Sequence, residues 1–290
     1  MSWVIYLFGS GLAFFLGMGL LVAALAIFAI SKRRWLLGLA SVLALIGPIV
    51  IGLSATPLPT WFYLTAAFVT FFWLLAELSQ RAWFVRHRKK FRLLALALWA
   101  TAVGMEAPYH FIPRIDLNGQ HDLYIIGDSV AAGVSSEETW TWPRLLAESG
   151  ELKAHDFSRM GATVSSATKQ AQQLPERGGI VLLEIGGNDL LGGTPSEKFE
   201  RDLDVLLARV DAPERTIVMF ELPLPPLSNR YGQVQRRLAA KHNVTLIPER
   251  VFMQVLTGKD ATLDSLHLSK QGHQDMATAV RTLILAPPEQ

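Results

Sequence analysis

The feature that most constrains this chain is a run of 28 residues, 3–30, without a single charged side chain. As a helix this run would be about 42 Å long, which exceeds the roughly 30 Å of hydrocarbon in a bilayer, so it would tilt or emerge at one end. A cleavable signal peptide has a basic start and a shorter apolar core, and the run has neither. We therefore predict a membrane span over residues 3–30.

Three further apolar runs, 35–53, 61–78 and 93–107, predict three more spans. Residues 1–107 would then form an all-α transmembrane domain of four helices. A helix buried in a soluble core is the alternative for each run, and it has most weight for the fourth, which is short and becomes polar at Glu106. We expect no ionisable pair inside the spans, and this disfavours an ion or proton pathway.

The charges between the runs predict an orientation. The connections 31–34 and 80–92 are basic, whereas 54–60 carries no charge. By the positive-inside rule the basic connections are cytoplasmic and the N-terminus is outside. If the fourth run crosses, the chain after about residue 108 also lies outside the cytoplasm. The sequence thus predicts a bacterial inner-membrane protein whose second part is periplasmic.

The net charge of +2 is a balance of +7 over residues 1–110 and −5 over the remainder. The basic character therefore belongs to the predicted membrane part, where it favours contact with membrane lipids. An acidic second part gives no reason to expect a nucleic-acid partner. The absence of cysteine excludes a disulfide framework and a thiol nucleophile.

The pattern changes after a linker at 108–120, and a second domain is predicted over 121–290. Short apolar runs that suit strands alternate there with longer runs that suit helices. This alternation predicts a parallel sheet with helices on both faces, an α/β fold. The predicted strands are 122–126, 153–157, 180–185, 216–221 and 244–247, and the predicted helices are 142–148, 162–173, 196–210, 231–241 and 270–285.

Side chains suited to nucleophilic catalysis follow these strands. Ser129 comes after the first strand, and Asp264 and His267 lie three residues apart after the fifth. A serine hydroxyl needs a base such as imidazole to take its proton, and the imidazole needs a carboxylate to fix its tautomer. Because ligands bind at the carboxyl ends of parallel strands, these three residues form the predicted catalytic set.

The same edge supplies candidate donors for an oxyanion. The N–H groups of Ser129 and Gly161 and the amide of Asn188 are the candidates. Each also has a simpler explanation, because Ser129 could begin a helix, Gly161 could serve only a turn and Asn188 could cap a helix. Trp140 and Trp142, after the serine turn, would line a substrate pocket or pack in the core.

Four segments in this order resemble the conserved blocks of the SGNH (GDSL-type) hydrolases, with the four family letters on Ser129, Gly161, Asn188 and His267. Asp264 matches the aspartate three residues before the histidine. The resemblance covers roughly residues 122–285 and implies a flavodoxin-like three-layer α/β/α sandwich, neither metal nor cofactor, and chemistry through a serine ester. Val130 stands where the family often has leucine, a packing position.

These observations predict a membrane-anchored serine esterase. Its substrate would be an acylated lipid or an acylated cell-envelope glycan, since four spans are not needed for small soluble esters. An O-acyltransferase could use the same residues to pass the acyl group to a glycan or lipid hydroxyl. A non-catalytic membrane scaffold is the alternative from another class of protein, and the complete set of Ser129, Asp264 and His267 disfavours it.

Overall fold

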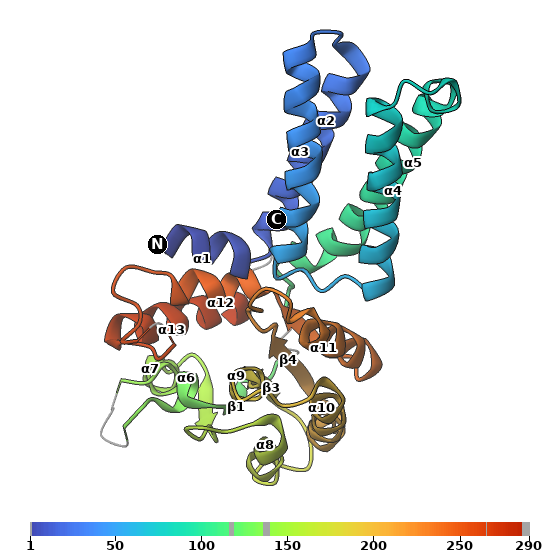
Figure 1. Cartoon of the computed structure of the whole chain (residues 1–290). Helices are drawn as coiled ribbons and strands as arrows, with labels where there is room; N and C mark the ends of the chain where they lie inside the picture. The colour runs from blue at the N-terminus through green and yellow to red at the C-terminus, as the bar shows by residue number, and fades with distance from the viewer. Residues whose placement is uncertain (1, 116–118, 136–139, 265, 286–290) are drawn as a thin grey trace. The chain divides into compact units, whose positions relative to one another are not determined.

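The computed structural model of the chain (Figure 1) describes residues 2–115, 119–135, 140–264 and 266–285. The chain divides into two compact units, which are described separately. A helical unit comprises Leu7–His110 together with Leu224–Asn229. An α/β unit comprises Phe111–Pro223 and Arg230–Gln290 together with Met1–Tyr6.

The long uncharged run does not form one helix. It forms α1 (Ser2–Gly9) and α2 (Leu12–Ile30), so the prediction of a single helix over 3–30 is wrong. Gly11 separates the two in the left-handed region, with φ of 74°, a conformation that glycine adopts without steric cost. The Gly11 carbonyl then accepts a hydrogen bond from the Ser54 hydroxyl at 3.3 Å.

Three helices of the described chain are long and apolar enough to cross a membrane: α2, α3 (Arg34–Leu53) and α4 (Thr60–Leu78). The predicted count of four is therefore too high by one. The fourth predicted run lies inside α5 (Ala82–Glu106), whose first half holds five basic side chains and leaves too short an apolar stretch. A short 3₁₀ helix, η1 (Ala107–His110), follows α5.

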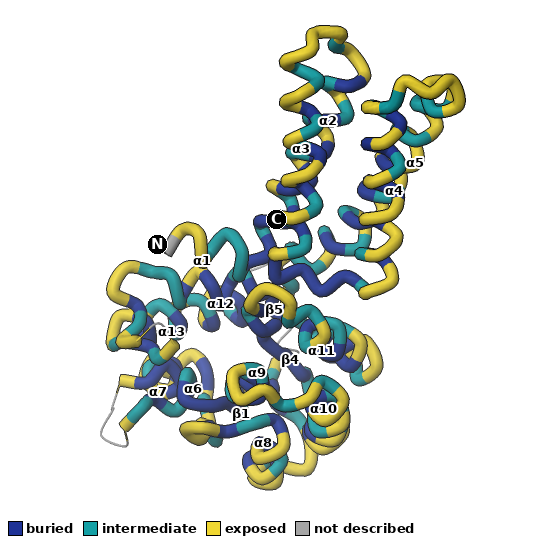
Figure 2. The backbone as a smooth tube through the Cα atoms, in the orientation of Figure 1, coloured by how far each residue is buried: buried dark blue, intermediate teal, exposed yellow. Residues whose placement is uncertain are grey.

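The helices of this unit bury one side against each other and expose the opposite side, where large apolar side chains lie (Figure 2). Helices α2 and α3 approach closely at Gly17 and Gly47. A Cβ on Gly17 would lie 2.7 Å from the Gly47 carbonyl oxygen, so only glycine permits this approach. Leu64, Phe68 and Phe71 of α4 are more than half exposed. An exposed apolar surface of this extent suits a lipid environment.

The helical unit also contains a partly buried ion pair, which lies at the edge of the predicted spans: Glu77 is near the end of 61–78, and Arg92 directly precedes 93–107. Arg92 of α5 reaches Glu77, near the end of α4, with Nε–Oε1 2.5 Å and Nη2–Oε2 2.8 Å. The Arg92 guanidinium also donates to the Phe28 carbonyl at 2.7 Å, and the Trp73 indole donates to Glu77 at 3.2 Å. The pair therefore joins α2, α4 and α5 at the end of α4.

The α/β unit contains a five-stranded parallel sheet in the order β2-β1-β3-β4-β5. Each strand lies within one or two residues of its predicted bounds, and four of the five are short, mainly apolar runs ended by turn residues, whereas β2 is polar and mostly exposed. The strand order is that of flavodoxin-like folds, which bind ligands where the order reverses, between β1 and β3. The strands are β1 (Asp122–Gly127), β2 (Lys153–Asp156), β3 (Ile180–Glu184), β4 (Thr216–Phe220) and β5 (Thr245–Ile247).

Helices cover both faces of this sheet, which gives the three-layer α/β/α sandwich expected from sequence (Figure 1). Side chains of α7, α12 and α13 share one core with alternate residues of the strands, among them Leu123 and Ile125 of β1. On the other face α8 and α10 pack against each other. The helices of this unit are α6 (Ser129–Ala132), α7 (Trp142–Ser149), α8 (Val164–Ala171), α9 (Gly187–Leu191), α10 (Ser196–Val210), α11 (Asn229–Lys241), α12 (Glu249–Leu256) and α13 (Lys270–Leu285).

Candidate active site

The nucleophile candidate Ser129 lies directly after β1 and begins the short helix α6. The preceding Asp128 caps this helix, because its Oδ1 accepts the Val130 N–H at 3.0 Å. Gly127 ends the strand where no side chain fits, since a Cβ there would lie 2.9 Å from the Ala131 Cβ. The turn holds Ser129 almost fully buried, with 9% of its surface exposed.

Two side chains from distant segments fix this turn. The Gln170 amide of α8 makes both hydrogen bonds to Gly127: its Oε1 accepts the N–H at 3.1 Å, and its Nε2 donates to the carbonyl at 3.0 Å. The Trp142 indole donates to the Val130 carbonyl at 3.1 Å, and the Trp142 N–H donates to His273 Nδ1 of α13 at 3.2 Å. The position of Ser129 therefore depends on α7, α8 and α13.

Asp264 and His267 form a local pair on the loop before α13. His267 Nδ1 lies 2.7 Å from Asp264 Oδ2, and the His267 N–H donates to Asp264 Oδ1 at 2.8 Å. These two hydrogen bonds, with a third from the Leu266 N–H, lower the pKa of Asp264 to about 2. With Nδ1 held by the carboxylate, Nε2 is the nitrogen left to act as a base.

His267 and Ser129 lie on neighbouring parts of the same site without touching. His267 is close enough to Asp128, the residue before Ser129, to lower the pKa of that carboxyl. In the part of the chain that the structure describes, no hydrogen bond joins the Ser129 hydroxyl to the His267 ring. Catalytic hydrogen bonds are often long in ligand-free enzymes, and they shorten when substrate binds.

The two other candidate oxyanion donors lie on the loops after β2 and β3. Gly161 has φ of 71°, and a Cβ built on it would have no neighbour within 4 Å, so backbone strain is the reason for glycine there. The Asn188 amide of α9 donates to the Ala162 carbonyl at 2.9 Å and to Asp128 Oδ2 at 3.3 Å. Asn188 therefore ties together the loops that carry Ser129 and Gly161.

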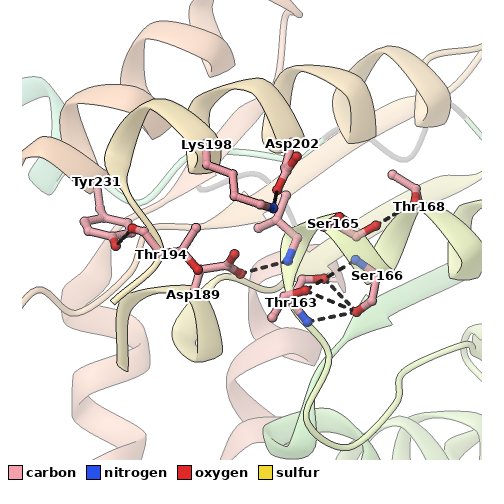
Figure 3. A network of polar contacts seen from close by, with 10 residues as sticks. Thr163, Ser165, Ser166, Thr168, Asp189, Thr194, Lys198, Asp202 and Tyr231 are labelled. Atoms are coloured by element: carbon pink, nitrogen blue, oxygen red, sulfur yellow. Dashed lines mark hydrogen bonds and ion pairs between the residues drawn. The ribbon is translucent and has the colours of Figure 1, made fainter. Parts of the chain in front are cut away.

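Asp189, next to Asn188, is also a structural link between loops (Figure 3). Its buried carboxylate accepts the Val164 N–H at 2.8 Å, at the first turn of α8. Thr163 and Ser166 complete a capping box at the same turn. Asp189 therefore fixes the loop of Gly161 against that of Asn188.

The two tryptophans differ in their surroundings. Trp142 is fully buried in the core below the serine turn. Of the two roles that the sequence left open for this residue, core packing is therefore the one observed. Trp140 is 37% exposed, and the ammonium group of Lys270 lies 5.7 Å from its ring centroid. Of the two, Trp140 is the one whose side chain a ligand can reach.

Buried carboxyl groups lie below the serine turn. Burial raises the pKa of Asp128 to about 6, and the Val130 N–H and the charge of His267 lower it in part. Burial raises the pKa of Glu184, the last residue of β3, well above its usual value, and the charge of Asp128 raises it further. Glu184 is not among the site residues predicted from sequence. The available signal was a glutamate at the end of an otherwise apolar strand run.

No group of three or more His, Cys, Asp or Glu side chains that could hold a metal ion occurs among the residues described. The groups brought together are instead those of serine chemistry: a hydroxyl, an imidazole with its carboxylate, and an amide. They come from the loops after β1, β2, β3 and β5, at the carboxyl edge of the sheet.

The chain is similar to known proteins. Residues 125–274 match the family described as the GDSL-like lipase/acylhydrolase family. The chain is 28% identical over 170 residues to thioesterase 1/protease 1/lysophospholipase L1 of Escherichia coli strain K12, covering 53% of this chain and 79% of that protein. It is 24% identical over 159 residues to esterase TesA of Pseudomonas aeruginosa, covering 50% and 78%. The crystal structure of esterase EstA from Pseudoalteromonas sp. has 20% identity and a TM-score of 0.45, and the likeness covers 56% of this chain and 98% of that chain.

Proposed function

This chain belongs to the GDSL-like lipase/acylhydrolase family and is an ester-hydrolysing enzyme of the SGNH type, and we propose that it deacylates a membrane lipid or an acylated cell-envelope glycan. The observation that carries the proposal is the His267–Asp264 pair at 2.7 Å, on the same sheet edge as the serine turn. The apolar helices α2, α3 and α4 associate the enzyme with a membrane.

In the proposed reaction the Ser129 hydroxyl attacks the ester carbonyl carbon while His267 Nε2 takes its proton. The tetrahedral intermediate collapses as the C–O bond to the alcohol breaks, and His267 returns the proton to the departing alcohol. Water then attacks the acyl-enzyme in the same way, which releases the acid and restores Ser129. Asp264 keeps the imidazole oriented and stabilises its charged form.

The oxyanion of each intermediate would be stabilised by the N–H groups of Ser129 and Gly161 and by the Asn188 amide. Asn188 already donates to Asp128 and Ala162, so its contribution requires one of these bonds to be exchanged for the oxyanion. Trp140 is the proposed aromatic contact for substrate, because it is exposed near the start of α7. The chemistry needs no metal or cofactor.

The choice of substrate rests on the membrane helices and on the relatives. Relatives with esterase, thioesterase, lysophospholipase and arylesterase in their names all cleave acyl groups, and a lysophospholipase acts on a lipid. A membrane-bound enzyme meets such amphipathic esters in the bilayer itself. An acyl lipid or an acylated envelope glycan is therefore the proposed substrate class, and no nucleic acid is involved.

We also propose that the enzyme resides in a bacterial inner membrane with its α/β unit on the periplasmic side. The basic connections 31–34 and 80–92 would be cytoplasmic. This side requires the second half of α5 to cross the membrane, although its apolar stretch is shorter than α2, α3 or α4. The course of α5 supports a crossing, since it runs back along α4: Arg92 contacts Glu77 near the end of α4, and Trp99 reaches Thr70 in its middle. The chain after α5 then emerges at the level where α4 begins.

A membrane-impermeant fluorophosphonate probe tests both proposals. Right-side-out and inverted vesicles containing the full chain or its Ser129→Ala variant are treated, and covalent labelling is measured. We expect labelling of the wild-type chain in right-side-out vesicles, and its loss in the variant. Labelling confined to inverted vesicles would reverse the proposed side, whereas no labelling in either type after detergent would favour a non-catalytic scaffold.

Acyl transfer is distinguished from hydrolysis by the fate of the acyl group. The same acyl-enzyme can pass its group to a sugar or lipid hydroxyl when that acceptor displaces water. Purified enzyme is incubated with a radiolabelled acyl ester and an added glycan acceptor, and free acid and acyl-glycan are measured separately. Release of free acid at the same rate with and without acceptor supports the esterase. Label that moves to the acceptor supports the O-acyltransferase.

A further inference from the structure

A cavity of about 450 Å³ opens beside Gly161, whose N–H is assigned to the proposed oxyanion hole. Its wall contains two cationic side chains, Arg159 and Lys169, together with the polar side chains of Ser166 and Gln173. None of the described residues that line it is acidic. The cavity thus presents two positive charges and several hydrogen-bond donors next to the reacting centre.

The cavity adjoins the elements that hold the candidate site. Arg159 and Gly161 lie on the loop after β2, and Lys169 and Gln170 lie on α8. Gln170 lines the cavity and also holds both backbone groups of Gly127, two residues before Ser129. One side chain, that of Gln170, therefore connects the cavity with the turn that carries the nucleophile.

One acidic side chain, Asp156, interacts with this wall. Asp156 is close enough for the charge of Arg159 to affect its pKa, but burial raises that pKa as the largest effect. Its Oδ1 already accepts hydrogen bonds from the Ser158 N–H at 2.9 Å and the Ser158 hydroxyl at 2.5 Å. Both cationic side chains of the cavity are exposed, so they can reorient towards a ligand.

We propose that this cavity binds an anionic group, a phosphate or a carboxylate, carried by the ester substrate. The proposal rests on the proposed hydrolysis at Ser129 and names the substrate class of that site. A guanidinium can bind either anion through two parallel hydrogen bonds, and an ammonium adds a compact charge. The preferred substrates are thus acyl esters with a negative charge near the scissile bond, and neutral esters are poorer substrates.

Matched ester pairs test the proposal with the full chain in a non-ionic detergent. The first pair is 1-acylglycerol 3-phosphate and 1-acylglycerol with the same acyl chain, which places the anion on the alcohol side. The second is the 4-nitrophenyl ester of glutaric acid and that of valeric acid, which places it on the acyl side, with uncatalysed hydrolysis subtracted. The readout is the ratio of kcat/KM for the anionic ester to kcat/KM for its neutral partner.

We expect the wild-type ratio to exceed one for at least one pair. The pair that shows this ratio identifies whether the bound anion lies on the alcohol side or on the acyl side of the ester. Exposed charge pairs contribute up to about 1 kcal/mol, so Arg159→Gln or Lys169→Gln should each lower the ratio about threefold, and the double variant about tenfold. Lys169→Glu should lower it further. Raising the salt concentration should reduce the wild-type ratio without any substitution.

Lys153→Gln is the matched control, because Lys153 is an exposed cation at the start of β2, the strand end away from the site. It should leave the ratio unchanged. Ratios near or below one for both wild-type pairs, or ratios in the double variant within twofold of the wild-type values, would overturn the anion site. Failure of the proposed function looks different: Ser129→Ala would then still hydrolyse the neutral esters at the wild-type rate.

Discussion

The carboxylate of Asp128 accepts a hydrogen bond from the Asn188 amide at 3.3 Å. The residue next to the proposed nucleophile thereby orients the side chain assigned to the oxyanion hole. Asp128 also caps the helix of Ser129 through the Val130 N–H. One buried carboxyl thus links the loops after β1 and β3, and its protonation state affects both.

Asp128 should make the α/β unit less stable as the pH rises. Its folded-state pKa of about 6 lies above the ordinary 3.8, so the folded protein holds this proton more tightly than the unfolded chain does. The neutral carboxyl contributes stability that is fully present below pH 3.8 and is lost as the pH rises through 6. The difference corresponds to about 3 kcal/mol.

Thermal unfolding of the full chain in detergent between pH 4 and pH 8 measures this effect against Asp128→Asn. The difference in stability between wild type and variant should shift in favour of the variant as the pH rises. Asp211→Asn, at an exposed helix end, should keep the wild-type pH profile. Parallel pH profiles for wild type and Asp128→Asn would contradict the prediction.

Asp264→Asn should lower kcat/KM by about 10³-fold to 10⁴-fold, because the amide cannot hold His267 in the productive tautomer or stabilise its charged form. The pKa of about 2 keeps Asp264 ionised across the working range, so this carboxylate contributes no acid limb to the wild-type pH profile. Steady-state hydrolysis of 4-nitrophenyl butyrate measures the loss. Asp275→Asn, on the exposed side of α13, is the control, and a loss below tenfold would exclude the proposed role.

Glu184 should tolerate replacement by glutamine but not by alanine. Its buried carboxyl lies below Gly127, with Oε2 3.2 Å from the point where a Cβ on that glycine would lie. Because burial raises the pKa of Glu184 and so favours its neutral form, which glutamine resembles, Glu184→Gln should retain activity within about threefold. Glu184→Ala leaves a cavity under the serine turn and should cost about 2–3 kcal/mol of stability. Equal losses of activity in both variants would mean that a charged Glu184 is required.

Gly17→Val should weaken the pairing of α2 with α3, whereas Gly19→Val should not. A Cβ on Gly17 meets Ile51 Cγ1 at 2.6 Å and the Gly47 carbonyl oxygen at 2.7 Å, while a Cβ on Gly19 has no neighbour within 4 Å. The two substitutions add the same side chain to the same helix. Thermal aggregation in detergent, followed by size-exclusion chromatography, compares them. Equal melting of both variants would contradict the close contact.

The sheet could be predicted because its central strands, above all the fully buried β3, read as continuous apolar runs between turn residues. The boundaries of the helices were harder to predict from sequence. Gly9 and Gly11 interrupt the first run, but glycine is common in membrane helices, and only the left-handed φ of Gly11 identifies the break. Helix α12 was not predicted, although it buries Val251, Phe252 and Val255 on one face.

The candidate site could be assembled from sequence where a residue type and its strand end both indicated chemistry, as for Ser129 and the Asp264–His267 pair. Gln170 and Glu184 could not be found in this way. A glutamine within a predicted helix looks like an exposed residue, and only the tertiary fold brings its amide to Gly127. The cationic wall of the cavity also depends on the fold, since Arg159 and Lys169 are ten residues apart on different elements.

The two hydrogen bonds of Trp142 also determine when the site can form during biosynthesis of the chain. The indole supports the turn of Ser129, and its backbone N–H bonds to His273, 131 residues later in the chain. A growing polypeptide can form the first of these contacts early, but the second waits until α13 has been synthesised. Nascent chains should therefore acquire esterase activity late, after the last helix has left the ribosome. Non-local contacts of this kind delay folding.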